Sequence, residues 1–517
     1  MWDAVLLNIE SNTFGLSLIY YALIFNVYPG GDPVIASTLA ALGCVPVAIA
    51  YASLSTAMPR SGGDYVFISR TLHPAMGVAS ALSISVWFFF FTGTYINWVF
   101  TVGVATALQV AGSVLGNATI LGVASLASEP VYVIVFGSLL ILVFGTIAIR
   151  SSRLAFKTLN VFVVLGLLGV FLWIILLGLT SRDTFVSLFN AYSSRYTNDT
   201  DYYHTIIKTA QQGGFNPSTG FNLTALVGMV PFAAYIYPYL AAQSAVGGEV
   251  KNPGKNFFSG LLINLLISAA MVGGATWALD SAAGYNFIMA ADYVFVNGLN
   301  YPLPTPPYFT LFAGVATTNL LLQALMAIGF IAWCLGIPLI NMIQVPRFLL
   351  AMSFDRILPG KFADIGRFGT PWVGLLLTAV ASEVMLIIYT VYANVLATVS
   401  AILGSIAATF MVACIAAAVF PFRKQTKPLY ENAPKLAALK IAGFPVVSLA
   451  GILGTLFLGW VSIEYATNPV YAANNAPSLL SVAGIYVVGI VVYFAAKAYR
   501  KRQGLDIARA VTQIPPE

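Results

Sequence analysis

Long apolar runs separated by short polar connectors recur along the whole chain. A helix needs about 20 apolar residues to cross roughly 30 Å of hydrocarbon, and the chain contains a series of runs near or above this length. We predict membrane-spanning helices at residues 5–27, 34–57, 75–110, 131–149, 155–180, 223–246, 258–279, 308–345, 372–392, 395–420, 443–465 and 479–497. The pattern predicts an all-α membrane protein with 12 transmembrane helices.

Composition supports this class and excludes others. Of the 517 residues, 59% are hydrophobic and 8% are charged, whereas soluble domains carry about a quarter charged residues. The net charge of +6 does not indicate nucleic-acid binding, because the basic residues lie between apolar runs. Cys44, Cys334 and Cys414 lie within such runs, at no metal-ligand or disulfide spacing. We therefore expect a protein of the lipid bilayer, with no metal, no cofactor and no nucleic-acid partner.

The basic residues predict the orientation of the spans. If the N-terminus is cytoplasmic, 21 of the 24 Lys and Arg fall in cytoplasmic loops, at the adjoining ends of the spans, or in the C-terminal tail. The exceptions are Arg182, Arg195 and Lys208. Cytoplasmic loops retain Lys and Arg during insertion. The first apolar run lacks a basic segment and a cleavage site, so we expect it to be retained. The sequence predicts a multi-pass plasma-membrane protein with both termini cytoplasmic.

Two of the predicted spans contain helix-breaking residues. Span 1 carries a polar cluster at Asn8–Gly15, and span 6 carries Pro231 and Pro238. A proline removes a backbone donor and clashes with the preceding turn, and each one alone is equally consistent with a packed kink. Placement at the start of two five-span sets favours an inverted repeat whose interrupted helices 1 and 6 line a site. Asp64-Tyr-Val-Phe-Ile and Asp292-Tyr-Val-Phe-Val, in equivalent connectors, weakly support the repeat.

This plan divides the chain into a transporter-like core and peripheral segments. The ten-helix core covers residues 1–420, with the first half at 1–180 and the second at 223–420. We expect the other segments to be an external loop at 181–222, a cytoplasmic loop at 421–442, two peripheral transmembrane helices at 443–498 and a cytoplasmic tail at 499–517.

Three strings resemble signatures of one permease family. They are Met58-Pro-Arg-Ser-Gly-Gly-Asp-Tyr-Val-Phe-Ile-Ser-Arg-Thr-Leu-His-Pro74, Gly248-Glu-Val-Lys-Asn-Pro253 and Pro346-Arg-Phe-Leu-Leu-Ala-Met-Ser-Phe-Asp-Arg-Ile-Leu-Pro359. In this order they resemble the amino acid, polyamine and organocation (APC) permeases. The resemblance implies a five-plus-five inverted-repeat fold with two peripheral helices, and amino acids or related amines as substrates.

The charged residues of these strings allow two interpretations. Arg60, Asp64, Arg70, Glu249 and Asp355 form either ion pairs of a cytoplasmic gate or a solvated loop whose charges only set topology. Gly62 and Gly63 permit a tight turn in either case. The two interpretations carry equal weight.

The resemblance also implies where a substrate binds. The amino acid carboxylate would meet span 1 at Ser11, Asn12, Thr13, Phe14 and Gly15, where helix N-terminal amides carry partial positive charge. The amine would meet span 6 at Tyr235, Ile236, Tyr237, Pro238 and Tyr239. Trp333 of span 8 is a candidate wall residue because its depth along the span places it near the midplane. The chain departs from the family here, because the glycine-rich motif of span 1 is reduced to Gly15 and proline replaces the glycine of span 6. An aromatic stripe in a membrane helix is otherwise typical of packing.

The coupling ion is the most open point. By resemblance, Gly166 stands where a coupling lysine would lie, and span 8 has no Ser or Thr between Thr318 and Ser353 to complete a sodium site. Glu10, an ionisable group inside span 1, is therefore the coupling candidate, with protons as the ion. A hydrogen-bonded or hydrated structural carboxylate is the alternative for Glu10. We interpret Glu383, in span 9, as structural.

These observations favour a secondary transporter that moves an amino acid or amine by alternating access. Uniport, exchange and proton symport all remain open. The alternative is a membrane sensor or scaffold that binds the substrate but does not cycle. We expect no enzyme, because the chain shows no nucleophile, metal cluster or carboxylate dyad, and His73 and His204 lie in loops.

Overall fold

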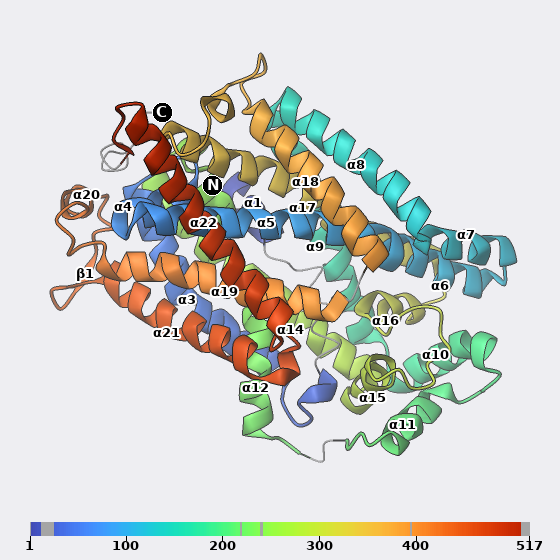
Figure 1. Cartoon of the computed structure of the whole chain (residues 1–517). Coiled ribbons are helices and arrows are strands. Elements are labelled where there is room, and N and C mark those ends of the chain that lie inside the picture. The colour runs from blue at the N-terminus through green and yellow to red at the C-terminus, as the bar shows by residue number, and fades with distance from the viewer. Residues whose placement is uncertain (1, 12–24, 218–219, 238–240, 393–394, 508–517) are drawn as a thin grey trace.

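The structure is a computed structural model that describes residues 2–11, 25–217, 220–237, 241–392 and 395–507. It is built almost entirely of α-helices, as the apolar runs predict (Figure 1). Within the described ranges, nine helical segments are long and apolar enough to cross a membrane. They are Pro33–Ala57 (α3), Pro74–Leu115 (α5, η2 and α6), Pro130–Arg150 (α8), Ser152–Leu179 (α9), Pro253–Ala283 (α14), Leu320–Phe354 (α17), Trp372–Tyr392 (α18), Val446–Thr467 (α21) and Ala476–Arg502 (α22).

These nine segments coincide with nine of the twelve predicted spans. Of the other three predicted spans, spans 1 and 6 include residues outside the described ranges, and span 10 is not among the nine segments. Their described parts are α1 (Trp2–Ser11) and η1 (Phe25–Val27) for span 1, α12 (Leu223–Ala234) and α13 (Ala241–Ala245) for span 6, and α19 (Val395–Val419) for span 10. The total of twelve spans and the inverted repeat therefore stay predictions.

The predicted span at 308–345 has different bounds in the structure. A short helix, α16 (Phe309–Val315), is followed by a break, and α17 begins at Leu320 and continues to Phe354. The Asn319 side chain causes the new start, because its Oδ1 accepts hydrogen bonds from the backbone N–H groups of Leu321 at 2.9 Å and Leu322 at 3.3 Å. Counting apolar residues cannot detect such a cap inside an apolar run.

Most of the shorter elements lie in the connectors, whereas η2 lies within the Pro74–Leu115 segment. They are η2, a π-helical turn (Val99–Val104), α4 (Gly63–Thr71), α7 (Ala118–Ser128), α10 (Arg182–Thr197), α11 (Tyr202–Gln212), η3 (Gly247–Glu249), α15 (Tyr285–Val296), η4 (Gly360–Ala363), α20 (Lys427–Glu431), η5 (Pro469–Tyr471) and the antiparallel strands β1 (Lys440–Ile441) and β2 (Phe444–Pro445). The segment 181–222, expected as a loop, is thus largely helical.

The connectors gather at two opposite ends of the molecule. Figure 1 places α4, α20, β1 and the last turns of α22 at one end, and α7, α10, α11 and α15 at the other. We call the first the inner end, since the distribution of Lys and Arg predicts that it is cytoplasmic, and the second the outer end. The alternation of connectors between the two ends is what the predicted topology requires.

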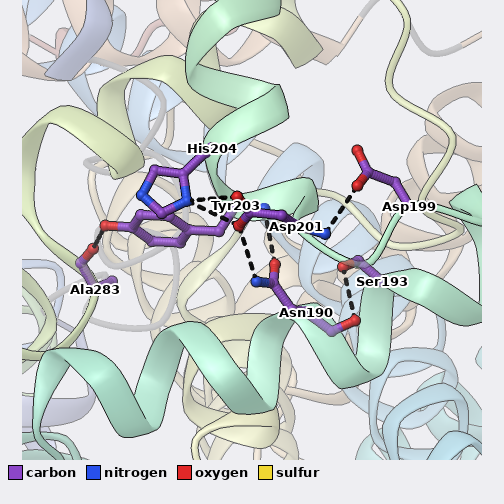
Figure 2. Close-up of polar contacts among 7 residues, drawn as sticks. All are labelled: Asn190, Ser193, Asp199, Asp201, Tyr203, His204 and Ala283. Carbon is purple, nitrogen blue, oxygen red and sulfur yellow. Dashed lines mark hydrogen bonds and ion pairs between the residues drawn. The ribbon is translucent and has the colours of Figure 1, made fainter.

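At the outer end, the segment of α10 and α11 packs against the end of α14 and the start of α15. The Tyr203 hydroxyl donates to the Ala283 carbonyl at 2.6 Å, and its ring stacks on Phe287 with centroids 4.2 Å apart. Figure 2 shows the hydrogen bond between Tyr203 and Ala283 beside an exposed pair in which His204 Nδ1 lies 2.8 Å from Asp201 Oδ1. Asn190 joins α10 to α11 through a 3.1 Å hydrogen bond to the same carboxylate. The segment therefore forms a packed cap.

Close contacts between glycines bring α9 against α17. A Cβ atom on Gly169 would lie 2.7 Å from the Gly329 Cα, so neither position tolerates a side chain without displacement of a helix. Small residues allow such backbone approach between membrane helices. This crossing places Trp333 of α17 directly over Gly166 of α9.

Candidate functional site

The end of α1 carries a buried carboxyl group that lies against α17. The Glu10 side chain is fully buried, and neither of its oxygens has a hydrogen-bond partner among the described residues. A Cβ atom on Gly336 would lie 1.9 Å from Glu10 Oε1, so the carboxyl group occupies the space that this glycine leaves on α17. An unpaired ionisable group at membrane depth is costly and marks a functional candidate.

Two amide side chains join α1 to α13 and α14 next to this carboxyl group. Asn8 Nδ2 donates to Gln243 Oε1 at 2.6 Å, and Gln243 Nε2 donates to the Asn256 carbonyl at 2.9 Å. A Cβ atom on Gly260 would lie 2.6 Å from Gln243 Oε1, so the amide packs tightly on α14. Asn8 Oδ1 is buried and accepts no hydrogen bond from the described part of the chain.

The helix of predicted span 6 is interrupted near its centre. α12 ends at Ala234, Tyr235–Tyr237 form a turn, and α13 begins at Ala241. The turn is stabilised by a hydrogen bond from the Ile236 N–H to the Ala233 carbonyl at 3.1 Å. The Tyr237 hydroxyl lies 2.5 Å from the Ser37 hydroxyl of α3. Tyr237 therefore ties the turn to α3, whereas Tyr235 and Ile236 are buried in the core.

Trp333 fills the space that a coupling lysine would need. Its indole ring is buried, and a Cβ atom on Gly166 would lie 2.3 Å from Trp333 Cε3. Any side chain at position 166 would displace the indole. Gly166 is thus required by packing, which gives a physical reason for the absence of a lysine there.

The remaining predicted site residues lie at or beyond the edge of the described ranges. Asn12, Thr13, Phe14 and Gly15 of span 1 and Pro238 and Tyr239 of span 6 lie outside the described residues. Ser11 is the last residue of α1, and its hydroxyl donates to the Asn8 carbonyl at 2.9 Å. The described site therefore consists of the ends of α1, α12 and α13 and the facing part of α17.

Two ion pairs fasten α17 at the inner end. Arg70 of α4 and Asp355, directly after α17, form a bidentate pair at 2.6 and 2.8 Å, and both side chains are almost fully buried. Tyr65 donates a further hydrogen bond to Asp355. The second pair joins Arg347 of α17 to Glu249 of η3 at 2.5 Å, with Glu249 partly exposed. We call these two pairs the inner latch.

Asp64 and Arg60 take no part in the inner latch. The Asp64 carboxylate accepts a hydrogen bond from Tyr51 at 3.0 Å and has no cationic partner in the described residues. Burial raises the pKa of Asp64 to about 7, because the charged carboxylate is removed from water. Arg60 likewise forms no ion pair with a described residue.

The glycines of the same string permit the chain to pack against two other segments. Gly62 and Gly63 have positive φ angles of 93° and 31°. A Cβ atom on Gly62 would lie 2.4 Å from the Ala351 Cβ, and one on Gly63 would lie 2.8 Å from the Ser244 carbonyl carbon. The Gly62 N–H donates to the Ala245 carbonyl at 2.9 Å. Both glycines are therefore needed where α4 meets α13 and α17.

The sequence reasoning did not select three residues of this site. Arg347 stands within the third family-like string, so its charge offered a signal that could have placed it with Glu249. Gln243 is a lone amide in a largely apolar segment, where a buried polar group needs a partner. Gly336 offers no signal in a sequence rich in glycine, because its role depends on the position of Glu10.

The chain matches known membrane permeases over most of its length. A family model described as amino acid permease matches residues 2–495. The branched-chain amino acid permease BcaP of Lactococcus lactis subsp. cremoris (strain MG1363) is 24% identical over 490 residues, covering 92% of this chain and 89% of that protein. The protein of the same name from Bacillus subtilis (strain 168) is 25% identical over 460 residues, covering 84% and 83%.

Proposed function

Because this chain belongs to the amino acid permease family, we propose that it is a secondary transporter that works by alternating access. It carries an amino acid or a related amine through a site between α1, the α12–α13 turn and α17. The interruption of span 6 after Ala234, where Tyr235–Tyr237 form a buried turn, is the observation that carries the proposal. Interrupted helices offer main-chain dipoles to both charged groups of an amino acid.

Branched-chain amino acids are the first substrates to test. Both relatives are named branched-chain amino acid permeases, and we propose that the buried side chains of Tyr235, Ile236 and Trp333 form the walls of the site. Such walls suit an apolar side chain by burial of its surface. Tyr237 acts as a positioning residue, since its hydroxyl bonds to Ser37.

Uptake by purified protein in liposomes tests the proposal. We expect accumulation of labelled leucine, isoleucine or valine, and competition within a panel of amino acids and amines identifies the preferred class. Imposed pH and sodium gradients distinguish symport from exchange and uniport. Substrate binding without uptake under every gradient and exchange condition would instead indicate the sensor or scaffold. If the protein neither binds nor transports any amino acid or amine of the panel, the assignment to these substrates is wrong.

Glu10 is our candidate for coupling transport to protons. Its buried carboxyl group has no described hydrogen-bond partner and lies between α1 and α17, where a proton can neutralise it. We expect Glu10→Gln to remove the dependence of uptake on a pH gradient while substrate exchange continues. The matched control is Glu383→Gln, since the Glu383 carboxylate on α18 accepts a 2.6 Å hydrogen bond from Ser138. An unchanged pH dependence in the Glu10 variant would exclude Glu10 as the proton carrier.

A further inference from the structure

A cavity opens at the inner end and is lined in part by α1 and α13, which also contribute to the proposed substrate site. It has a volume of about 530 Å³, within the range of about 300–1,000 Å³ that small-molecule sites occupy. Its walls come from the N-terminal part of α9, from Leu7 of α1, and from α13, the start of α14 and the segment that joins these two helices. The cavity therefore lies between the inner solvent and the end of α1.

The walls of this cavity are strongly cationic. Arg153 and Lys157 are one turn apart on α9 and line the same side, while Lys251 lines the connector opposite. None of the three forms an ion pair with a described residue. Glu249, the acidic residue of the lining, is already neutralised by Arg347 at 2.5 Å. The positive-inside rule explains basic residues at this end, but it does not require that they face one cavity.

The cavity reaches an amide that connects it to the interior. Gln243 lines the cavity and at the same time accepts the hydrogen bond from Asn8. The other amide atom of Asn8, Oδ1, is a buried acceptor without a donor among the described residues, and Asn8 is not part of the cavity lining. The cavity thus combines three cations with a buried amide that contacts α1. The carboxylate of an amino acid is the group that matches these cations.

We propose that this cavity is a release-side subsite that binds the carboxylate of a zwitterionic amino acid through Arg153, Lys157 and Lys251. The inference deepens the proposed function and rests on it. Three cations around one small cavity attract a carboxylate and repel a substrate of net positive charge. The subsite therefore narrows the substrate class from amino acids or amines to neutral or acidic amino acids.

The test compares transport kinetics at the two faces of the membrane. Leucine is the probe, in right-side-out and inside-out vesicles that contain either the wild type or Arg153→Gln/Lys157→Gln. We expect the KM for leucine at the inner face to rise about tenfold, equivalent to ~1.4 kcal/mol, with the KM at the outer face unchanged. Isoamylamine, which is leucine without its carboxylate, should inhibit the variant at the inner face at least as strongly as the wild type.

Two control variants separate the subsite from a general effect of charge. Lys361→Gln/Arg367→Gln removes two cations from exposed positions at the same end, outside the cavity lining, and should leave both KM values unchanged. Lys157→Arg keeps the positive charge and should raise the inner KM less than Lys157→Gln does. The proposal of a subsite is wrong if the control double variant shifts the inner KM as much as the cavity variant does. It is also wrong if the cavity variant shifts neither KM.

Lipid composition distinguishes a substrate carboxylate from a lipid phosphate in the same cavity. The difference in KM between wild type and variant should be the same in phosphatidylcholine alone and with added phosphatidylglycerol. A difference that appears only with the anionic lipid would assign the cations to a headgroup and overturn the proposal. Wild-type protein that neither binds nor transports leucine or any other amino acid would instead refute the proposed function itself.

Discussion

The connectors α4 and α15 carry nearly the same five residues but are held in different ways. Asp64-Tyr-Val-Phe-Ile lies in the first turns of α4 at the inner end. Asp292-Tyr-Val-Phe-Val forms the last five residues of α15 at the outer end. In α4, Asp64 accepts from Tyr51, and Tyr65 donates to Asp355, which also pairs with Arg70. In α15, Asp292 is buried with no described hydrogen-bond partner.

The outer connector depends on aromatic packing instead of charge. The Tyr293 hydroxyl donates to the Gly213 carbonyl at 2.7 Å, and Phe295 contacts the rings of Tyr301 and Tyr308 edge to face. Burial raises the pKa of Asp292 well above its ordinary value. The inner end is thus held by ion pairs and the outer end by aromatic packing, so removal of one ion-pair partner would leave the other charge buried and uncompensated.

Removal of one partner of the inner latch should give the largest loss of stability. Arg70→Ala leaves Asp355 buried without its cation, which typically costs about 3–5 kcal/mol. We expect a lower melting temperature in detergent and greater labelling of cysteines introduced near the inner end. The paired change Arg70→Met/Asp355→Leu removes both charges and should recover much of this loss. Equal stability of Arg70→Ala and wild type would show that the pair does not hold α4.

The two buried aspartates should make stability fall as pH rises. An acid whose pKa is higher in the folded state binds its proton more tightly there, so the folded state loses this advantage as pH increases. For Asp64 the window runs from 3.8 to about 7, a change of at most about 4 kcal/mol at ~1.36 kcal/mol per pH unit. Asp64→Asn should flatten the melting temperature across this window, and Asp292→Asn should reduce the slope further.

The exposed Asp364 provides the control for this pH dependence. Asp364→Asn keeps both buried carboxyl groups and should show the wild-type slope between pH 4 and pH 7. A wild-type slope in the Asp64 variant as well would mean that the Asp64 carboxyl group does not titrate in this range.

The two tyrosines of the repeated sequence should give the smallest and most direct contrast. Tyr65→Phe removes a hydrogen bond to the ion-paired Asp355, worth about 1.5–3 kcal/mol, whereas Tyr293→Phe removes one to a carbonyl, worth about 0.5–1.5 kcal/mol. Both changes keep the ring. Melting temperatures of the two variants measured side by side check the order, and the reverse order would contradict the stronger hydrogen bond of Tyr65.

Sequence reasoning was most successful where a property depends on composition over many residues. The nine long helices follow from apolar runs, since each must bury its backbone hydrogen bonds within the bilayer. It failed where a single side chain decides a boundary, as with Asn319 at the start of α17, and where short polar helices such as α10 form a cap. Family-like strings placed Arg70, Asp355 and Glu249 near one end, but did not identify Arg347 as the partner of Glu249.

By itself, the sequence determined the membrane class, the helical architecture and the amino acid permease family. Those properties follow from local hydrophobicity and from motifs that are contiguous in the chain. Only the tertiary structure decided that Glu10 faces Gly336, that Trp333 covers Gly166 and that Arg153 and Lys157 face a cavity with Lys251. These contacts join residues up to hundreds of positions apart, and the rotation of each helix about its axis, which no single apolar run specifies, decides whether they form.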